Sequence, residues 1–535
     1  MTRVLFYSPY ATWNYHTALE ATWAHGLKAR GVDVQFVTCN ALSKVCDVYR
    51  ENLNPRHEGA CLTCQASTSA LFASLEMPYD WLGTYLAPTV REEAESWAKG
   101  LNDHDLLNAR WRGMDVGKWA AASAYNQYRT ASLLLDDPHV VQTLRDLLVG
   151  TVLNLEAMDT LLDLHRPDTL VLLNGRFSGH WAAIELAKLK GIRFVSHERG
   201  FTKNTVRFSE NARTHELGGM RELWEQWRDI PLDPAESAAA AQLLLDRRAG
   251  RNFSRMSFSP ALQERSRVKQ ELSLDDRPLV AVFTSSDDET AAFPDRTEGA
   301  FPISNHFLPA VIELAQGRPD VQFVFRIHPN IQKAQAGTNQ DALTHAEQIR
   351  QQAPANVRVV MPSDDVSSYT LMDIANVGMV YGSTAGLEMA ACGKPVLCMA
   401  QSTYTHTGIA GQVNHPSELA QALDRALGQD VDLEVARIAM RWTYRYFHEY
   451  SVPFDLVNGP TDDGPASLTY TSLAQLAEGQ HPILDRVCSY LAGQSPSVRP
   501  GITIDERQRD SVSETQSLAL WLHRINGIEQ PRAAV

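Results

Sequence analysis

Two series of short apolar strands that alternate with helices constrain the fold of this 535-residue chain more than any other feature. In the first series, residues 4–7 and 34–37 have the composition of buried strands, and residues 17–30 between them carry apolar side chains at helical spacing. Gly31 follows the helical segment, which is a usual signal for a helix end. This order of strand, helix and strand predicts the opening of a doubly wound parallel sheet.

Two segments interrupt the first series: the cysteine-rich residues 39–64 and the mainly helical residues 80–165. The alternation then resumes through predicted strands at 169–173 and 193–196. We therefore predict a Rossmann-like N-terminal domain over residues 1–205, which carries both segments as insertions.

A second series follows residues 206–265, which show no strand–helix rhythm and which we interpret as a connector. It predicts a second Rossmann-like domain over residues 266–434, then a return helix and a C-terminal tail over residues 435–535. The predicted strands of this domain are residues 279–283, 321–326, 357–360, 377–381 and 395–399. The fold class is therefore α/β, with two Rossmann-like domains, a helical insertion and a helical tail.

The charge balance and the hydropathy pattern exclude several classes of protein. Forty-nine Lys and Arg against 63 Asp and Glu give a net charge of −14, which argues against general nucleic-acid binding. No apolar run approaches the ~18 residues that span a bilayer, and the N-terminus lacks the pattern of a signal peptide. We expect a cytoplasmic protein, at most peripheral to the inner face of the membrane.

The stretch from Tyr381 to Val396 carries the strongest functional signal. It predicts a strand, a tight turn, and a helix that begins at Ser383 and Thr384. A helix start presents free N–H groups that suit a phosphate, and the two hydroxyl groups can cap the helix or donate to phosphate oxygens. Glu388, one turn later, can accept hydrogen bonds from ribose hydroxyls. A plain capped turn between strand and helix is the alternative.

Polar residues also follow two other predicted strands of the second domain. Arg326 and His328 stand at the end of one strand, and Ser285 and Ser286 stand at the end of another. Ligands of open α/β sheets bind at the carboxyl ends of the strands, so these side chains are candidates for nucleotide binding. The alternatives are an ordinary surface loop for the histidine and a capped loop for the serines.

The order of strand-end serine, His-Pro, Ser-Thr-x-x-x-Glu and Gly-Lys-Pro resembles the nucleotide-binding half of GT-B glycosyltransferases. It is most similar to the capsule polysaccharide biosynthesis group, which includes bacterial Kdo transferases, and it covers residues 275–450. The resemblance implies sugar transfer from a nucleotide-sugar donor, bound between two Rossmann-like halves, to a glycan or lipid-linked acceptor. It implies that the N-terminal domain, residues 1–205, holds that acceptor. It also implies that the nucleotide site needs no metal, and that His328, Ser383, Thr384 and Glu388 contact the nucleotide.

The stereochemistry and the catalytic base follow from further residues. A retaining-type Glu-x7-Glu is absent, because Val380 stands eight positions before Glu388, and this favours inversion. An inverting transferase needs a base within hydrogen-bond reach of the acceptor hydroxyl. Glu198 and His16, at predicted strand ends of the N-terminal domain, are the candidates. For each, a loop residue with an ordinary partner is the alternative.

Four of the seven cysteines are close in sequence and form a C-x6-C-x14-C-x2-C pattern: Cys39, Cys46, Cys61 and Cys64. In a reducing compartment such a local group favours a metal site over two disulfides. We predict a structural zinc ion here. An iron–sulfur cluster, disulfides and free thiols stay open as alternatives.

Three other functions fit the same fold. A nucleotide-sugar epimerase rearranges its sugar without an acceptor, a polyol-phosphate transferase uses a different donor, and a glycan-assembly scaffold keeps the fold without the chemistry. The helical insertion at residues 80–165 favours a role with an acceptor, since an epimerase needs no such surface. Nucleotide-dependent stabilisation would separate either enzyme from the scaffold.

Overall fold

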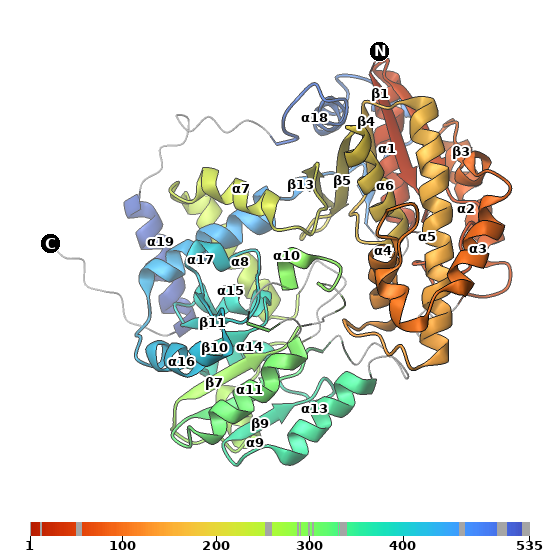
Figure 1. The fold of residues 1–535 in the computed structure, drawn as a ribbon. Coiled ribbons are helices and arrows are strands. Elements are labelled where there is room, and N and C mark those ends of the chain that lie inside the picture. Colours follow the sequence, from red (N-terminus) through yellow and green to blue (C-terminus); the bar gives the residue numbers. More distant parts are fainter. Residues whose placement is uncertain are drawn as a thin grey trace. The chain divides into compact units, whose positions relative to one another are not determined.

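The computed structural model describes residues 2–10, 13–49, 56–251, 259–285, 288, 290–297, 300–301, 304–329, 331, 340–459, 466–499 and 511–526. The chain forms two compact units (Figure 1). Unit 1 comprises residues 1–216 and 451–501, and unit 2 comprises residues 217–450 and 502–535. Residues 206–265, expected as a connector, lie partly in each unit.

Unit 1 is built on a seven-stranded sheet with the order β13-β6-β5-β4-β1-β2-β3. The strands from β3 to β5 are parallel, and β6 and β13 add an antiparallel edge. Strands β2 and β3 follow β1 on one side, and strands β4, β5 and β6 follow it on the other side. The topological switch point of the unit therefore lies between β1 and β4. The strands are β1 (Arg3–Ser8), β2 (Asp33–Thr38), β3 (Asp80–Trp81), β4 (Thr169–Leu173), β5 (Arg193–Arg199), β6 (Thr205–Glu210) and β13 (Val452–Pro453).

Alternation along β1 explains why this sheet has helices on both faces. Leu5 and Tyr7 pack into one apolar core with α4, α5 and α6, whereas Val4 and Phe6 pack into another with α1 and α18. Successive side chains of a strand point to opposite faces, so a continuous apolar strand is buried on both. The helices are α1 (Asn14–Ala29), α2 (Ala60–Ser74), α3 (Val90–Gly100), α4 (Val116–Tyr128), α5 (Pro138–His165), α6 (Ser178–Lys190) and α18 (Pro482–Leu491).

Unit 2 contains a six-stranded, fully parallel sheet with the order β12-β11-β10-β7-β8-β9. This is the Rossmann order, and its switch point lies between β7 and β10. The strands are β7 (Leu279–Phe283), β8 (Gln322–Arg326), β9 (Val357–Val360), β10 (Val377–Val380), β11 (Val396–Cys398) and β12 (Gly411–Gln412).

The helices of unit 2 cover this sheet and extend beyond it. Helices α11, α13 and α16 contribute to the apolar core on one face. The last helix, α19, is tied to the end of α15, because the Trp521 indole donates to the Ala391 carbonyl at 2.7 Å. The helices are α7 (Gly218–Trp227), α8 (Pro234–Arg248), α9 (Arg265–Glu271), α10 (Pro294–Thr297), α11 (Ser304–Gln316), α13 (Gln340–Gln352), α14 (Ser368–Ile374), α15 (Thr384–Ala390), α16 (Leu419–Leu427), α17 (Leu433–Tyr444) and α19 (Ser511–Asn526).

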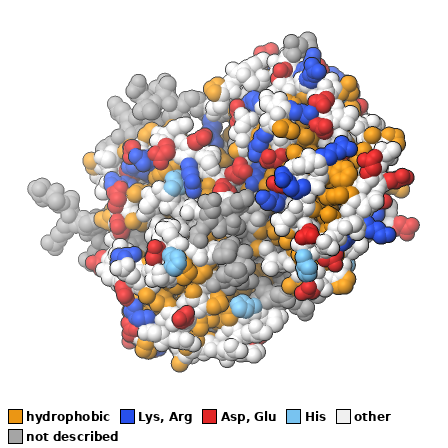
Figure 2. Space-filling model, viewed as in Figure 1, with side chains coloured by type: hydrophobic (Ala, Val, Ile, Leu, Met, Phe, Trp, Pro, Cys, Tyr) orange, Lys and Arg blue, Asp and Glu red, His pale blue; other side chains and the backbone are white. Residues whose placement is uncertain are grey.

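The predicted α/β fold with two Rossmann-like sheets is confirmed. None of the helices in the described part of the chain is long and apolar enough to cross a membrane. On the face drawn in Figure 2, acidic and basic side chains of the described residues are intermixed rather than separated into one basic surface.

Candidate functional site

The switch point of unit 2 brings together two of the loops that the sequence singled out. Ser285 follows β7, and its hydroxyl donates to the carbonyl of Tyr381, which follows β10, at 2.5 Å. Gly382 then turns the chain with a φ of 67°, and a Cβ there would lie 3.3 Å from the Gln401 carbonyl oxygen. Ser383 caps α15 by accepting the Ala385 N–H at 3.3 Å. Ser285 and Ser383 therefore belong to one edge of the sheet; Ser286 lies outside the described residues.

The two predicted residues after β8 have different surroundings. The backbone N–H of His328 donates to the Thr284 hydroxyl at 2.8 Å, which joins the loop after β8 to the loop after β7. The Arg326 guanidinium is buried and donates to the Met361 carbonyl at 2.6 Å. Burial lowers the pKa of Arg326 to about 10. The structure thus places His328 beside the loop after β7 and Arg326 beside the end of β9.

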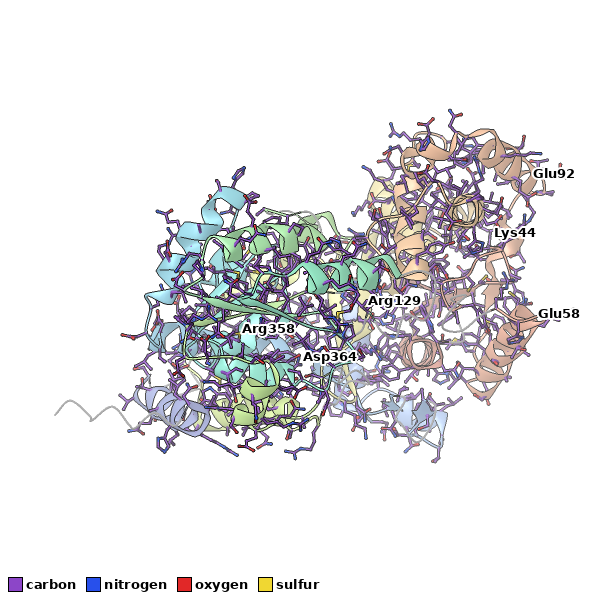
Figure 3. All side chains as sticks on the ribbon, turned by 90° about the horizontal axis from the view of Figure 1, so that it is seen from below. Lys44, Glu58, Glu92, Arg129, Arg358 and Asp364 are labelled. Atoms are coloured by element: carbon purple, nitrogen blue, oxygen red, sulfur yellow. The ribbon has the colours of Figure 1, made fainter. Side chains whose placement is uncertain are left out.

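The turn after β9 is stabilised by its own aspartate. The carboxylate of Asp364, which is labelled in Figure 3, accepts the Met361 N–H at 2.7 Å. This contact closes the loop against which the Arg326 guanidinium lies. The loop after β9 is therefore held by this internal bond and by further bonds to residues 259–263, among them the Ser367 N–H to the Gln263 side chain at 3.0 Å.

Glu388 is held by a residue of unit 2 that the sequence analysis did not select. Arg247, at the end of α8, lies 2.9 Å from one Glu388 carboxylate oxygen and donates to the Thr384 hydroxyl at 3.3 Å. The Glu388 side chain is only 5% exposed, and its second oxygen, Oε2, has no hydrogen-bond partner among the described residues. Arg247 thus neutralises a buried carboxylate next to the start of α15, where a bare negative charge would repel a phosphate.

Arg247 could not be found from a motif, because its segment shows no strand–helix rhythm. The one available signal is the basic run from Arg247 onward, which follows an alanine-rich helix. The ring of Phe447 lies under its guanidinium, at 5.4 Å from the ring centroid. These partners lie far apart in the sequence, so only the folded chain shows that they meet.

The two candidate bases of unit 1 lie side by side. Glu198 is on β5 and His16 is in the first turn of α1, and the His16 Nε2 lies 3.4 Å from one Glu198 oxygen. The other oxygen accepts the Asn174 side-chain amide at 2.7 Å and lies 3.6 Å from the His215 Nε2. The backbone N–H of Arg199 adds a further bond at 2.9 Å. One largely buried carboxylate therefore carries two imidazoles at the carboxyl edge of the sheet.

Burial and neighbouring charges set the protonation of this group. Burial lowers the pKa of His16 to about 4, against the opposing effect of Glu198. Burial would raise the pKa of Glu198, but His16, His215 and Arg199 outweigh it and hold that pKa well below its usual range. At neutral pH the carboxylate is therefore ionised and the His16 ring is neutral. This is the arrangement of a base that is oriented by a carboxylate.

A model of one protein family matches the part of the chain that carries the nucleotide motifs. The model is described as capsule polysaccharide biosynthesis protein, and it matches residues 295–435. The predicted resemblance is confirmed. No curated protein sequence matches the chain.

Solved structures with similar folds come from several enzymes. A Thermosulfurimonas dismutans KpsC, described as a beta Kdo 2,4 transferase, is 13% identical, with 58% of this chain and 87% of that chain covered and a TM-score of 0.33. A UDP-GlcNAc 2-epimerase from Neisseria meningitidis is 11% identical, covering 84% and 99%, with a TM-score of 0.24. The glycosyltransferase SnogD from Streptomyces nogalater is 15% identical, covering 83% and 96%, with a TM-score of 0.24. At these values the likenesses assign no activity to the chain.

The cysteine prediction is not supported. The described part of the chain, which includes Cys39, Cys46, Cys61 and Cys64, holds no group of three or more His, Cys, Asp or Glu side chains that could bind a metal ion. Cys61 and Cys64 share the first turns of α2, whereas Cys39 and Cys46 lie in the chain after β2. Burial raises the pKa of Cys39 and that of Cys46, so both are thiols at neutral pH.

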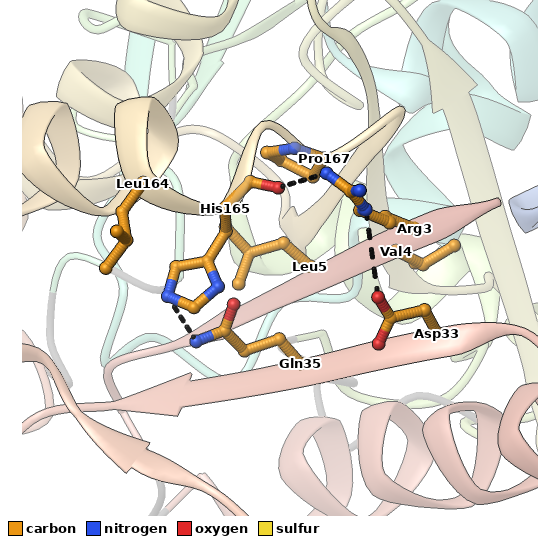
Figure 4. A pocket seen from close by; sticks show the side chains of 8 residues that line it. All are labelled: Arg3, Val4, Leu5, Asp33, Gln35, Leu164, His165 and Pro167. Carbon is orange, nitrogen blue, oxygen red and sulfur yellow. Dashed lines mark hydrogen bonds and ion pairs between the residues drawn. The ribbon is translucent and has the colours of Figure 1, made fainter. Parts of the chain in front are cut away.

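One clear pocket of unit 1 lies at the opposite end of the sheet from Glu198. It is lined by the first residues of β1 and β2 and by the end of α5 (Figure 4). The Gln35 amide and the His165 ring lie 3.0 Å apart in it, and Arg3 donates to the His165 carbonyl at 3.2 Å. Because ligands of parallel sheets bind at the carboxyl ends of the strands, this pocket is not the candidate active site.

Proposed function

We propose that the chain is an inverting glycosyltransferase, which moves a sugar from a nucleotide-sugar donor to a hydroxyl group of a capsule-type surface glycan. The observation that carries this proposal is the position of the Glu198 carboxylate between His16 and His215 at the carboxyl edge of unit 1. The family match over residues 295–435 supports the choice of glycan chemistry. The proposal assigns proton transfer to unit 1 and nucleotide recognition to unit 2.

In unit 1, an imidazole accepts the proton of the acceptor hydroxyl as its oxygen attacks the anomeric carbon. The bond to the donor phosphate breaks in the same displacement, and the nucleotide leaves with the bonding electrons. His16 is the first candidate, because its neutral ring lies beside a carboxylate that stabilises the imidazolium when it forms. His215 is the second imidazole on that carboxylate.

In unit 2, the hydroxyl groups at the switch point serve the donor. Ser285 and Ser383 lie on the two loops that meet there, and Thr384 follows at the start of α15. The unpartnered Oε2 of Glu388 suits a ribose hydroxyl, because a buried carboxylate oxygen without a partner is costly until it accepts one. His328 stands on the adjoining loop.

The proposal extends to a glycan or lipid-linked acceptor and to a reaction in the cytoplasm, at the inner face of the membrane. The acidic net charge of −14 is consistent with weak rather than strong attachment to an anionic surface. Flotation of the purified protein with anionic-lipid vesicles tests this part. Absence of co-flotation with or without acceptor lipid would contradict the membrane association and leave the transfer reaction untouched.

A thermal-shift screen against UDP, GDP, CDP, CMP, dTDP and ADP tests the proposed donor site. A ligand at 100 times its Kd stabilises the native state by about 2.7 kcal/mol, so the correct nucleotide raises the Tm by several degrees. Ser383→Ala should remove this shift, whereas Ser417→Ala, a serine of unit 2 outside the switch point, should preserve it. No shift with any of the six nucleotides would contradict the proposal.

Product analysis with the matching sugar nucleotide then identifies the reaction. Consumption of the donor only when an acceptor glycan is present, with inverted anomeric configuration in the product, is the expected result. Conversion of the sugar nucleotide to an isomer without acceptor would instead establish an epimerase.

A further inference from the structure

A second histidine–glutamate pair joins the same two elements as the pair of His16 and Glu198. The His197 Nε2 lies 2.7 Å from a Glu20 oxygen, and both side chains are fully buried. In the first pair α1 supplies the histidine, His16, and β5 supplies the glutamate, Glu198. In the second pair α1 supplies the glutamate, Glu20, and β5 supplies the histidine, His197. Helix α1 is thus attached to β5 twice, once at the partly exposed edge and once in the interior.

The buried pair is not explained by stability alone. The Oε2 of Glu20 and the Nδ1 of His197 have no hydrogen-bond partner among the described residues. A buried polar pair that is only half satisfied contributes little compared with apolar side chains of similar volume. The ring of Trp23 packs edge-on against His197, with centroids 4.9 Å apart, so an apolar residue would fit this environment.

The geometry of a helix transmits the contact at Glu20 to His16. The two residues are four positions apart on α1, so they lie on one face and about 6 Å apart along the axis. A bond from Glu20 to β5 therefore fixes both the rotation and the height of the first turn of α1. The His16 and His197 rings lie 5.9 Å apart, which places the two pairs next to each other.

We propose that Glu20 and His197 are positioning residues, which lock α1 against β5 so that the His16 imidazole is held beside the Glu198 carboxylate. This inference rests on the proposed function, because it assigns His16 and Glu198 to proton transfer. Glu20 touches neither donor nor acceptor in this scheme and acts through the helix.

Three variants of α1 test the proposal. Glu20→Leu removes the bond to His197, and Glu20→Gln keeps an acceptor oxygen at the same place. Thr22→Val is the matched control: Thr22 is buried on the same helix, and its hydroxyl lies 3.1 Å from the Tyr470 hydroxyl rather than against β5. We expect Glu20→Leu to lower kcat by 10- to 100-fold with the donor KM within two-fold, Glu20→Gln to restore most of the activity, and Thr22→Val to retain full kcat.

Titration of His16 gives a readout that does not depend on activity. The groups that act on this ring are Glu198, His197 and Arg199 of β5 and His180 of α6. With histidine labelled by ¹⁵N, the His16 signal should titrate near pH 4 in the wild type and in Thr22→Val. In Glu20→Leu the midpoint should rise toward the ~6.5 of a free histidine, because a released ring gains water.

The outcomes separate the two claims. Equal kcat and equal His16 titration in Glu20→Leu and Thr22→Val would overturn the positioning role, whatever the Tm values are. Should the wild type show no transfer with any donor, the proposed function fails, and the titration alone decides whether Glu20 positions His16. A shifted titration that Glu20→Gln reverses supports the positioning role in either case.

Discussion

The two switch points of this chain share a topology and differ in their side chains. In unit 1 the edge beyond β1, β4 and β5 carries titratable groups, with Glu198 of β5 between two imidazoles. In unit 2 the edge beyond β7 and β10 carries hydroxyl groups, with the charge of Glu388 neutralised by Arg247. The parallel sheet determines where a ligand binds, and the residues after the strands determine whether that edge moves a proton or holds a phosphate.

The most severe test of this difference is Glu198→Gln, which removes the charge from unit 1 and keeps the shape. We expect kcat to fall by 10²- to 10⁴-fold, because the imidazolium that forms during transfer loses its carboxylate. The Kd for the nucleotide, measured by calorimetry, should stay within two-fold. Glu210→Gln, a more exposed glutamate of β6 paired with Arg193, is the control and should keep full activity. A weaker nucleotide Kd in Glu198→Gln would contradict the division of roles.

The corresponding test in unit 2 is Arg247→Met. It leaves the Glu388 carboxylate buried without its partner, so we expect the free energy of unfolding to fall by about 3–5 kcal/mol. Nucleotide affinity should fall about ten-fold, since an uncompensated negative charge then faces the phosphates.

The neighbouring residue provides a matched control for this variant. Arg248 also forms a buried ion pair, with Asp373 at 2.5 Å. Its guanidinium donates to the Cys392 sulfur at 3.3 Å, whereas Thr384 and Glu388 are the partners of Arg247. Arg248→Met should therefore destabilise the unit to a similar extent and leave the Kd unchanged when binding is measured on the folded protein. Equal losses of affinity in both variants would show that Arg247 acts only through stability.

The pH dependence of stability should sharpen the contrast, because the two largest decreases in histidine pKa are in unit 1. Burial lowers the pKa of His16 to about 4 and that of His180 to about 3. Below pH ~6.5 the unfolded chain binds these protons and the native chain does not, so stability falls as the pH falls. Each histidine contributes up to roughly 1.4 kcal/mol per pH unit in this window. Urea unfolding at pH 7 and pH 5 should show a loss of a few kcal/mol. Burial also lowers the pKa values of His25, His165, His406 and His448, which contribute smaller shares. His180→Phe should reduce the loss markedly; an unchanged loss in that variant would contradict the assignment.

Sequence reasoning succeeded where local pattern determines structure. Most of the parallel strands followed from their apolar runs, whereas β6 was missed because it lies in residues predicted as a connector. Ser383 was found as a helix start because capping depends on neighbours in sequence. His16 and Glu198 were both selected from strand ends, and the sheet order brings them together. Strand ends are thus informative even before the partners are known.

The residues that sequence reasoning missed depend on packing between distant segments. Nothing in the connector indicated that Arg247 would reach Glu388, because a side-chain pair across two helices has no periodicity to detect. His215 was missed for a similar reason, since it follows β6 in an irregular segment. The predicted role of Arg326 as a nucleotide ligand stays a prediction, although its guanidinium is directed to the Met361 carbonyl.

The smallest expected effect concerns Cys61, where the structure and the spacing of the cysteines disagree. A C-x2-C pair is typical of zinc sites, but three-residue spacing also results from one turn of any helix, and α2 begins at Ala60. The Cys61 sulfur accepts a hydrogen bond from the Arg56 guanidinium at 2.8 Å at the protein surface. Cys61→Ser should therefore change the free energy of unfolding by less than about 0.5 kcal/mol, as surface substitutions usually do. Stoichiometric zinc in the purified wild type, lost together with several degrees of Tm in Cys61→Ser but not in Cys488→Ala, would contradict this expectation and show that the four cysteines rearrange around an ion.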